Sequence, residues 1–86
     1  MVRLGQNYPN PFNPSTEILY ELFSPGHVRL EVFDMTGRSV GVLSDGVRPA
    51  GQHTERFDAS GLPTGMYVYR LTTGVETLTR IMTLVR

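Results

Sequence analysis

The side chains that could support catalysis or bind a metal are few and lie far apart in the sequence. The chain has two histidines, His27 and His53, and no cysteine. Neither histidine has a second histidine or a cysteine at the spacing that a zinc site uses. We therefore interpret His27 as a residue that follows a turn and His53 as the opening of a strand, so the sequence predicts no zinc site.

A serine and an aspartate near His53 are of the types that a hydrolytic triad uses. His53, Asp58 and Ser60 lie close together in the chain, but no nucleophile-elbow sequence surrounds the serine. Asp58 and Ser60 are better explained as side chains that close turns onto the local backbone. We expect no catalytic residue and no cofactor, and the chain itself is not predicted to be an enzyme.

Three loop aspartates, Asp34, Asp45 and Asp58, carry the hard oxygen ligands that calcium prefers. None of them belongs to a dense array of alternating acidic residues that ends in a bidentate glutamate. The stretch from Leu62 to Gly65 is similar to a sortase signal but is one residue short, and a turn that leads into a strand explains it better. Tyr67 follows this corner, where its hydroxyl is expected to bind upstream backbone as in the tyrosine corner of immunoglobulin-like domains.

Composition and charge exclude several classes of partner. The 86 residues suffice for one domain with a thin core, and eight arginines balance eight acidic residues, with no lysine. The arginines are scattered from Arg3 to Arg86, so the basic stripe that binds nucleic acid or anionic membrane is missing. No apolar run is long enough for a transmembrane segment, and Met1 to Asn10 do not resemble a signal peptide, so an export signal would have to lie elsewhere.

The hydrophobic pattern predicts strands throughout. Apolar residues alternate with polar ones, turn formers separate the runs, and no window has a helical period. The fold class we expect is all-β, an immunoglobulin-like antiparallel β-sandwich of about seven strands, with a loop from Ser44 to Gly51. The expected strands are 16–22, 28–33, 39–43, 52–58, 66–73 and 77–85, and a short pairing of 2–4 supplies the seventh.

A Pro-rich segment precedes these strands. Three prolines fall within the six residues from Pro9 to Pro14 and restrict the backbone on both sides. Tyr8 and Phe12 are aromatic anchors that an ordinary linker lacks, so we expect both to pack on the sandwich. The organisation predicted is a Pro-rich segment, 1–14, that packs on a sandwich domain, 15–86; the alternative is an ordinary Pro-rich linker.

The run from Leu4 to Thr16, LGQNYPNPFNPST, resembles the opening of the type A C-terminal sorting domains of the type IX secretion system. Further likeness follows in order along the chain, which is covered from Leu4 to Arg86: Gly26 to Asp34, Gly37-Arg38, Gly51-x-His53, Phe57 to Tyr67 and Met82-x-Leu84. Relatives often carry Lys where this chain has Arg80 and Arg86. Arginine keeps the charge but changes hydration and donor geometry.

The resemblance implies a function in protein transport. Such domains end proteins of Bacteroidetes and related phyla, are read by the secretion machinery after export to the periplasm, and are fixed to the cell surface or released. The implied partners are the type IX machinery proteins and N-terminal cargo domains of the same chain, often hydrolases. The terminal strand, with its edge expected to be open, would carry recognition through Arg80, Met82, Leu84 and Arg86.

Three other functions stay open at the level of the sequence. Sandwiches of this kind also serve as carbohydrate-binding or adhesive modules of surface hydrolases, although the aromatic residues here fall mostly at inward positions and tryptophan is absent. A hook-cap-like structural domain is similar in sequence pattern. A minimal enzyme is the least supported, because no nucleophile, metal or paired-acid constellation exists.

Overall fold

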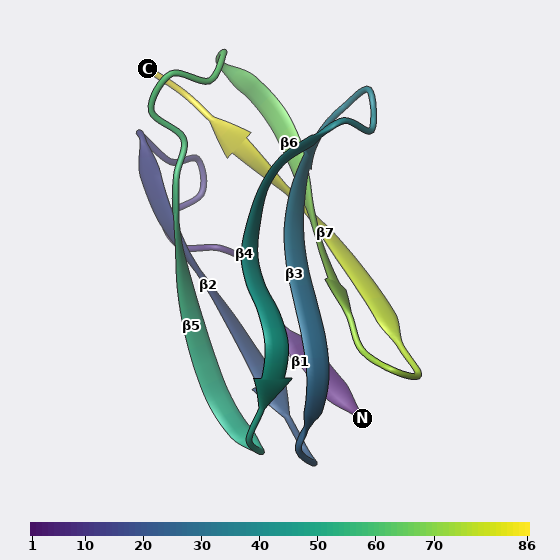
Figure 1. The fold of residues 1–86 in the computed structure, drawn as a ribbon. Coiled ribbons are helices and arrows are strands. Elements are labelled where there is room, and N and C mark those ends of the chain that lie inside the picture. Colours follow the sequence, from purple (N-terminus) through teal and green to yellow (C-terminus); the bar gives the residue numbers. More distant parts are fainter.

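The computed structural model describes all 86 residues and contains seven strands and no helix (Figure 1). The chain ends lie at opposite ends of the molecule. No helix is present that could cross a bilayer. The strands are β1 (Val2–Leu4), β2 (Ser15–Leu22), β3 (Gly26–Asp34), β4 (Ser39–Arg48), β5 (Gly51–Asp58), β6 (Gly65–Thr72) and β7 (Thr77–Leu84).

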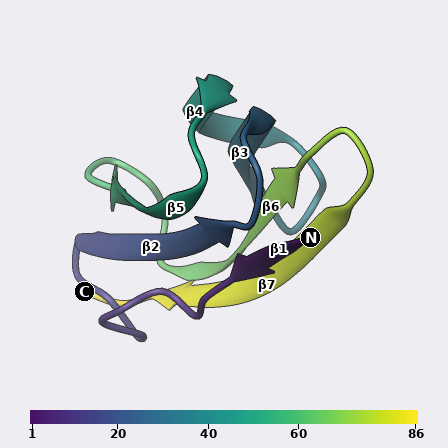
Figure 2. The ribbon, with the colours of Figure 1, turned by 90° about the horizontal axis from the view of Figure 1, so that it is seen from below.

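The strands form two antiparallel sheets that face each other. One sheet has the order β1-β2-β5 and the other the order β4-β3-β6-β7. Viewed from below, β1 lies beside β7 where the edges of the two sheets approach each other (Figure 2). The predicted all-β sandwich of about seven strands is confirmed.

The core forms because alternate residues of each strand point between the sheets. Along β2, Ile18, Tyr20 and Leu22 are buried while Glu17 and Leu19 point outward. The same alternation holds in β3 and β6. The buried apolar residues are Val2, Leu4, Phe12, Ile18, Tyr20, Leu22, Val28, Leu30, Val32, Phe57, Ala59, Tyr67, Tyr69, Leu71, Met82 and Leu84.

Local side-chain hydrogen bonds hold the turns as the sequence predicted. Asp34 Oδ1 accepts from the backbone N–H groups of Thr36 (2.9 Å) and Arg38 (3.1 Å), which closes the β3–β4 hairpin. Asp58 Oδ1 accepts from both the backbone N–H (2.9 Å) and the hydroxyl (2.6 Å) of Ser60. The interpretation of Asp58 and Ser60 as turn residues is therefore confirmed.

The tyrosine corner is also present. The Tyr67 hydroxyl donates to the carbonyl of Pro63 at 2.5 Å, in the turn that leads into β6. The sortase-like stretch is thus this turn.

The predicted loop from Ser44 to Gly51 is wrong. Strand β4 continues to Arg48, and its register on β3 pairs Asp45 with Arg29 and Val47 with His27. Two register shifts, at Leu43 and Val40, lie in the first half of β4, as bulges do in edge strands, and the residues from Ser44 to Arg48 pair with β3 in unbroken register. Asp45 is held in the strand by its contacts with His27 and Arg29 of β3, so the turn formers near it do not end the strand. Only Pro49 and Ala50 separate β4 from β5.

Candidate recognition surface at the C-terminal strand

Strand β7 pairs with β6 on one side only, so its other side is an edge of the four-stranded sheet. We expected this edge to be open, and for its second half that prediction is wrong. The N-terminal segment lies along it: the Phe12 N–H donates to the Thr83 carbonyl (2.9 Å), and the Val85 N–H donates to the Phe12 carbonyl (3.0 Å). These bonds extend the sheet by a parallel bridge between Phe12 and Leu84.

Two amide side chains occupy further positions on the same edge. Asn10 Oδ1 accepts from the Thr83 N–H at 3.0 Å, and Gln6 Nε2 donates to the Ile81 carbonyl at 2.9 Å. Together with the two Phe12 bonds they satisfy the outward backbone groups of β7 from the carbonyl of Ile81 to the N–H of Val85. A partner strand could add to this half of β7 only by displacing the N-terminal segment.

The segment is held in place by Phe12. Its side chain is 1% exposed and meets Phe57 edge to face, with the ring centroids 6.2 Å apart. Burial of a phenylalanine in this geometry supplies both apolar area and a favourable ring contact. Phe12 therefore packs as expected.

Tyr8 does not pack on the sandwich, contrary to expectation, and its side chain is 81% exposed. Its backbone forms an antiparallel bridge with Glu17, with both N–H to carbonyl distances at 2.9 Å. Residues directly opposite in such a bridge point to the same face of a sheet. Because Glu17 points to solvent, Tyr8 does too.

A buried hydrogen-bond network ties the segment to both sheets, centred on Asn7, which is 2% exposed. The Asn7 N–H donates to the Tyr69 hydroxyl (2.8 Å), and Nδ2 donates to Thr16 Oγ1 (3.1 Å) and to the Pro9 carbonyl (3.0 Å). The Tyr69 hydroxyl in turn donates to the Gly5 carbonyl at 2.7 Å. Burial raises the pKa of the Tyr69 phenol, so the neutral form that donates this bond is favoured.

The four residues proposed for recognition do not share one surface. Met82 and Leu84 are fully buried in the core, so neither side chain is accessible to a partner of the folded domain. Arg80 and Arg86 are exposed, and each donates to a backbone carbonyl: Arg80 Nε to Leu4 (2.8 Å) and Arg86 to Leu62. Their guanidinium groups form no ion pair with a carboxylate.

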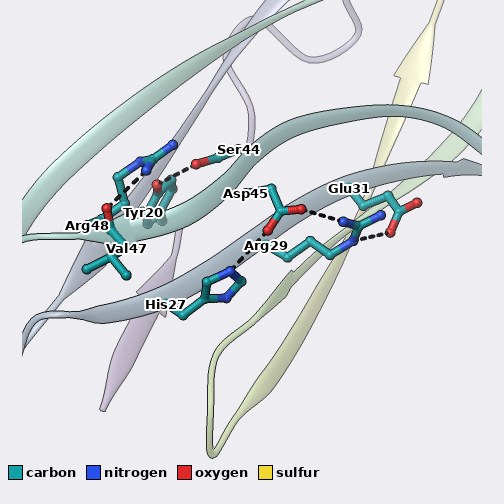
Figure 3. Close-up of polar contacts among 8 residues, drawn as sticks. All are labelled: Tyr20, His27, Arg29, Glu31, Ser44, Asp45, Val47 and Arg48. Atoms are coloured by element: carbon teal, nitrogen blue, oxygen red, sulfur yellow. Dashed lines mark hydrogen bonds and ion pairs between the residues drawn. The ribbon is translucent and has the colours of Figure 1, made fainter.

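The outer face of the four-stranded sheet has a charged half on β3 and β4 (Figure 3). The Asp45 carboxylate lies 3.1 Å from His27 Nε2 and 2.7 Å from the Arg29 guanidinium, and Arg29 also lies 3.1 Å from the Glu31 carboxylate. Hydrogen bonds from Ser39 and from Arg29 lower the pKa of Glu31. Charges in this half are therefore compensated within the domain.

An apolar row crosses this face beside the charged residues. The strand register aligns Phe33, Val68 and Ile81 in one row across β3, β6 and β7, with Met66 beside them on β6. Met66 and Ile81 are each 47% exposed. We call these four residues the outer-face patch.

The histidines and acidic residues do not form a site. His53 stacks on Tyr20 with ring centroids 5.2 Å apart and contacts the Pro49 carbonyl at 2.8 Å, so its role in the structure is packing between β5 and β2. No three His, Asp or Glu side chains converge as they would around a metal ion.

The sequence interpretation missed the structural role of Gln6, Asn7 and Asn10. A signal was present, because all three amides lie within three residues of Pro9. Proline has no N–H, so the neighbouring backbone there leaves carbonyls for side-chain donors. The bonding partners on β2, β6 and β7 lie far away in the sequence and could not be deduced from it.

Comparison with known proteins supplies the remaining observations. Residues 6–84 match the model of a protein family described as the secretion system C-terminal sorting domain. No curated protein sequence matches the chain. Among solved structures, the alkylpurine DNA glycosylase AlkC of Pseudomonas fluorescens, bound to DNA with an abasic site analogue, is similar at a TM-score of 0.52 and 16% identity. The alignment covers 99% of this chain and 30% of that one, so the likeness concerns the fold of one part of the glycosylase.

Proposed function

The chain belongs to the C-terminal sorting domains of the type IX secretion system, and we propose that it directs a larger protein through that system to the cell surface or the medium. The observation that carries this proposal is the family match over residues 6–84 of 86. The packing of the family's opening motif against the terminal strand supports it, because both ends of the matched region meet in one structural unit.

In this proposal the domain acts as a folded signal and performs no chemistry. The machinery proteins bind it after the whole protein reaches the periplasm, and N-terminal cargo domains of the same chain carry any activity. Of the four residues expected to carry recognition, Arg80 and Arg86 are those whose side chains are available for such binding. Met82 and Leu84 would act indirectly, by keeping β7 in the sandwich.

The proposal is tested by fusing the chain to the C-terminus of a periplasmic reporter in a host that has the type IX system. We expect the reporter on the surface or in the medium with the domain, and in the periplasm without it. Arg80→Gln with Arg86→Gln should lower surface delivery while the thermal midpoint stays close to that of the wild type. Periplasmic retention of the wild-type fusion would refute the sorting function.

One observation favours a second candidate, a carbohydrate-binding function. The exposed Tyr8 ring borders a shallow groove with Ser15, Glu17 and Arg56, which is a combination of a stacking face and polar groups that suits a sugar. Affinity electrophoresis of the wild type and of Tyr8→Ala in gels containing soluble polysaccharides tests it. Retardation of the wild type that is lost in the variant would support this function.

A further inference from the structure

We propose that the outer-face patch, Phe33, Met66, Val68 and Ile81, is the docking surface for an acidic protein partner in the sorting step. The inference rests on the proposed sorting function and identifies the surface and the chemistry of the partner. It concerns the outer face of the four-stranded sheet, which the core and the N-terminal segment leave uncovered.

The outer face of β7 is accessible to a partner, whereas the second half of its edge is covered by the N-terminal segment. The Ile81 carbonyl and both backbone groups of Thr83 are bonded to Gln6, Asn10 and Phe12, and Met82 and Leu84 point into the core. On the outer face, β7 presents the side-chain row Thr79, Ile81 and Thr83.

The patch has the composition of a protein interface. Phenylalanine, methionine and arginine are enriched in such surfaces, and the Arg70 guanidinium lies over the Phe33 ring at 4.4 Å. The apolar side chains come from three adjacent strands and form a row, rather than being scattered singly. Half-exposed Met66 and Ile81 can still lose area to a partner.

The charge of the C-terminal strands indicates that the partner is acidic. From Gly65 to Arg86 the chain has three arginines, Arg70, Arg80 and Arg86, and one acid, Glu76. None of these arginines is within ion-pair distance of a carboxylate, and Glu76 lies 3.5 Å from the N-terminal amine. Of the three, Arg70 is the one on the outer face, opposite Glu31 in the strand register. Arg80 and Arg86 bind the Leu4 and Leu62 carbonyls beside the edge and the end of β7.

The opposite sheet has the reverse charge. Strands β1, β2 and β5 together carry Glu17, Glu21, Glu55 and Asp58 against Arg3 and Arg56. The net charge of zero therefore hides a cationic β6–β7 hairpin, whose field steers an acidic partner toward this part of the domain, and Arg70 is the group that complements such a partner on the outer face. Three separated arginines are fewer than the cluster of about four to eight that anionic membranes select.

Site-specific photo-cross-linking in the type IX-competent host tests the proposal. A benzophenone amino acid replaces Thr79 on the outer face beside Arg70, or the exposed Thr54 in the middle of β5, in the opposite sheet, as the matched control. The expected result is an adduct with an acidic protein from Thr79 only, and about a tenfold lower yield when Arg70→Glu is added.

Surface delivery of the reporter fusion provides the second readout. Met66→Thr with Ile81→Thr keeps the strand propensity and removes apolar area, and Leu19→Thr with Val75→Thr is the control at exposed apolar positions elsewhere. We expect about a tenfold fall for the first pair and less than twofold for the control. Both variants should melt close to the wild type.

The outcomes separate the two proposals. Wild-type delivery together with unchanged delivery of Met66→Thr/Ile81→Thr, or the same adduct from Thr54, overturns the docking surface and leaves the sorting function intact. An adduct between two copies of this chain, or with lipid only, overturns the acidic protein partner. A wild-type fusion that stays in the periplasm refutes the sorting function and the docking surface with it.

Discussion

The N-terminal segment gives a sharp prediction, because its two aromatic residues have opposite environments. Phe12 is 1% exposed and Tyr8 is 81% exposed, although only four positions separate them. We predict that Phe12→Ala strongly destabilises the domain and that Tyr8→Ala leaves its free energy of unfolding almost unchanged.

The magnitude follows from the burial of Phe12. Truncating a buried phenylalanine to alanine costs about 3–5 kcal/mol, and the edge-to-face contact with Phe57 is included in that figure. A domain of 86 residues has a total stability of roughly 4–13 kcal/mol. Phe12→Ala should therefore remove a large share of it and lower the melting temperature by more than about 10 °C.

Urea denaturation followed by far-ultraviolet circular dichroism measures both variants against the wild type. The expected loss is about 3 kcal/mol or more for Phe12→Ala and within about 0.5 kcal/mol for Tyr8→Ala. Equal effects of the two substitutions, or a loss below 1 kcal/mol for Phe12→Ala, would show that the segment is not part of the folded unit.

Three further predictions concern polar groups. Asn7→Ala should cost roughly 1–3 kcal/mol, because it removes buried hydrogen bonds to Thr16 and Pro9, whereas Gln6→Ala, at an exposed position, should cost less than half as much by the same denaturation assay. Burial raises the folded-state pKa of Tyr69, so its contribution to the free energy of unfolding is complete below about pH 10 and is lost as the pH rises through the folded pKa. Between about pH 8 and about pH 11.5 the urea midpoint should fall in the wild type and stay flatter in Tyr69→Phe. Hydrogen bonds from Ser60 lower the pKa of Asp58, so its contribution to the free energy of unfolding is present above the ordinary carboxyl pKa and is lost as the pH falls through the folded value. Asp58→Asn should therefore flatten the decline of the urea midpoint below about pH 4, and an unchanged slope would contradict this.

The strands could be predicted from the sequence because period-two alternation records which face of a sheet each residue occupies. The side chains of β2, β3 and β6 follow this rule without exception in the core. The length of β4 could not be predicted, since Ser44 and Gly46 favour turns locally and only the ion pairs of Asp45 across the strand show that the extended chain continues.

Which parts of the terminal strand are accessible could not be predicted from the alternation of apolar and polar residues. Closure of the β7 edge requires Phe12 to meet Thr83 and Val85, which lie at the other end of the chain. Likewise, the row of Phe33, Val68 and Ile81 exists only because β3, β6 and β7 are neighbours in that order. The sequence therefore predicted the terminal strand as the region of interest, and the sheet order determined which of its sides is accessible.

The most direct test of the sorting function is the location of one reporter fusion in two hosts that differ only in the type IX machinery. With the wild-type domain, protease-accessible reporter should appear on the surface or in the medium of the competent host and remain in the periplasm of the deficient one. Equal distribution of the reporter in the two hosts would contradict the account.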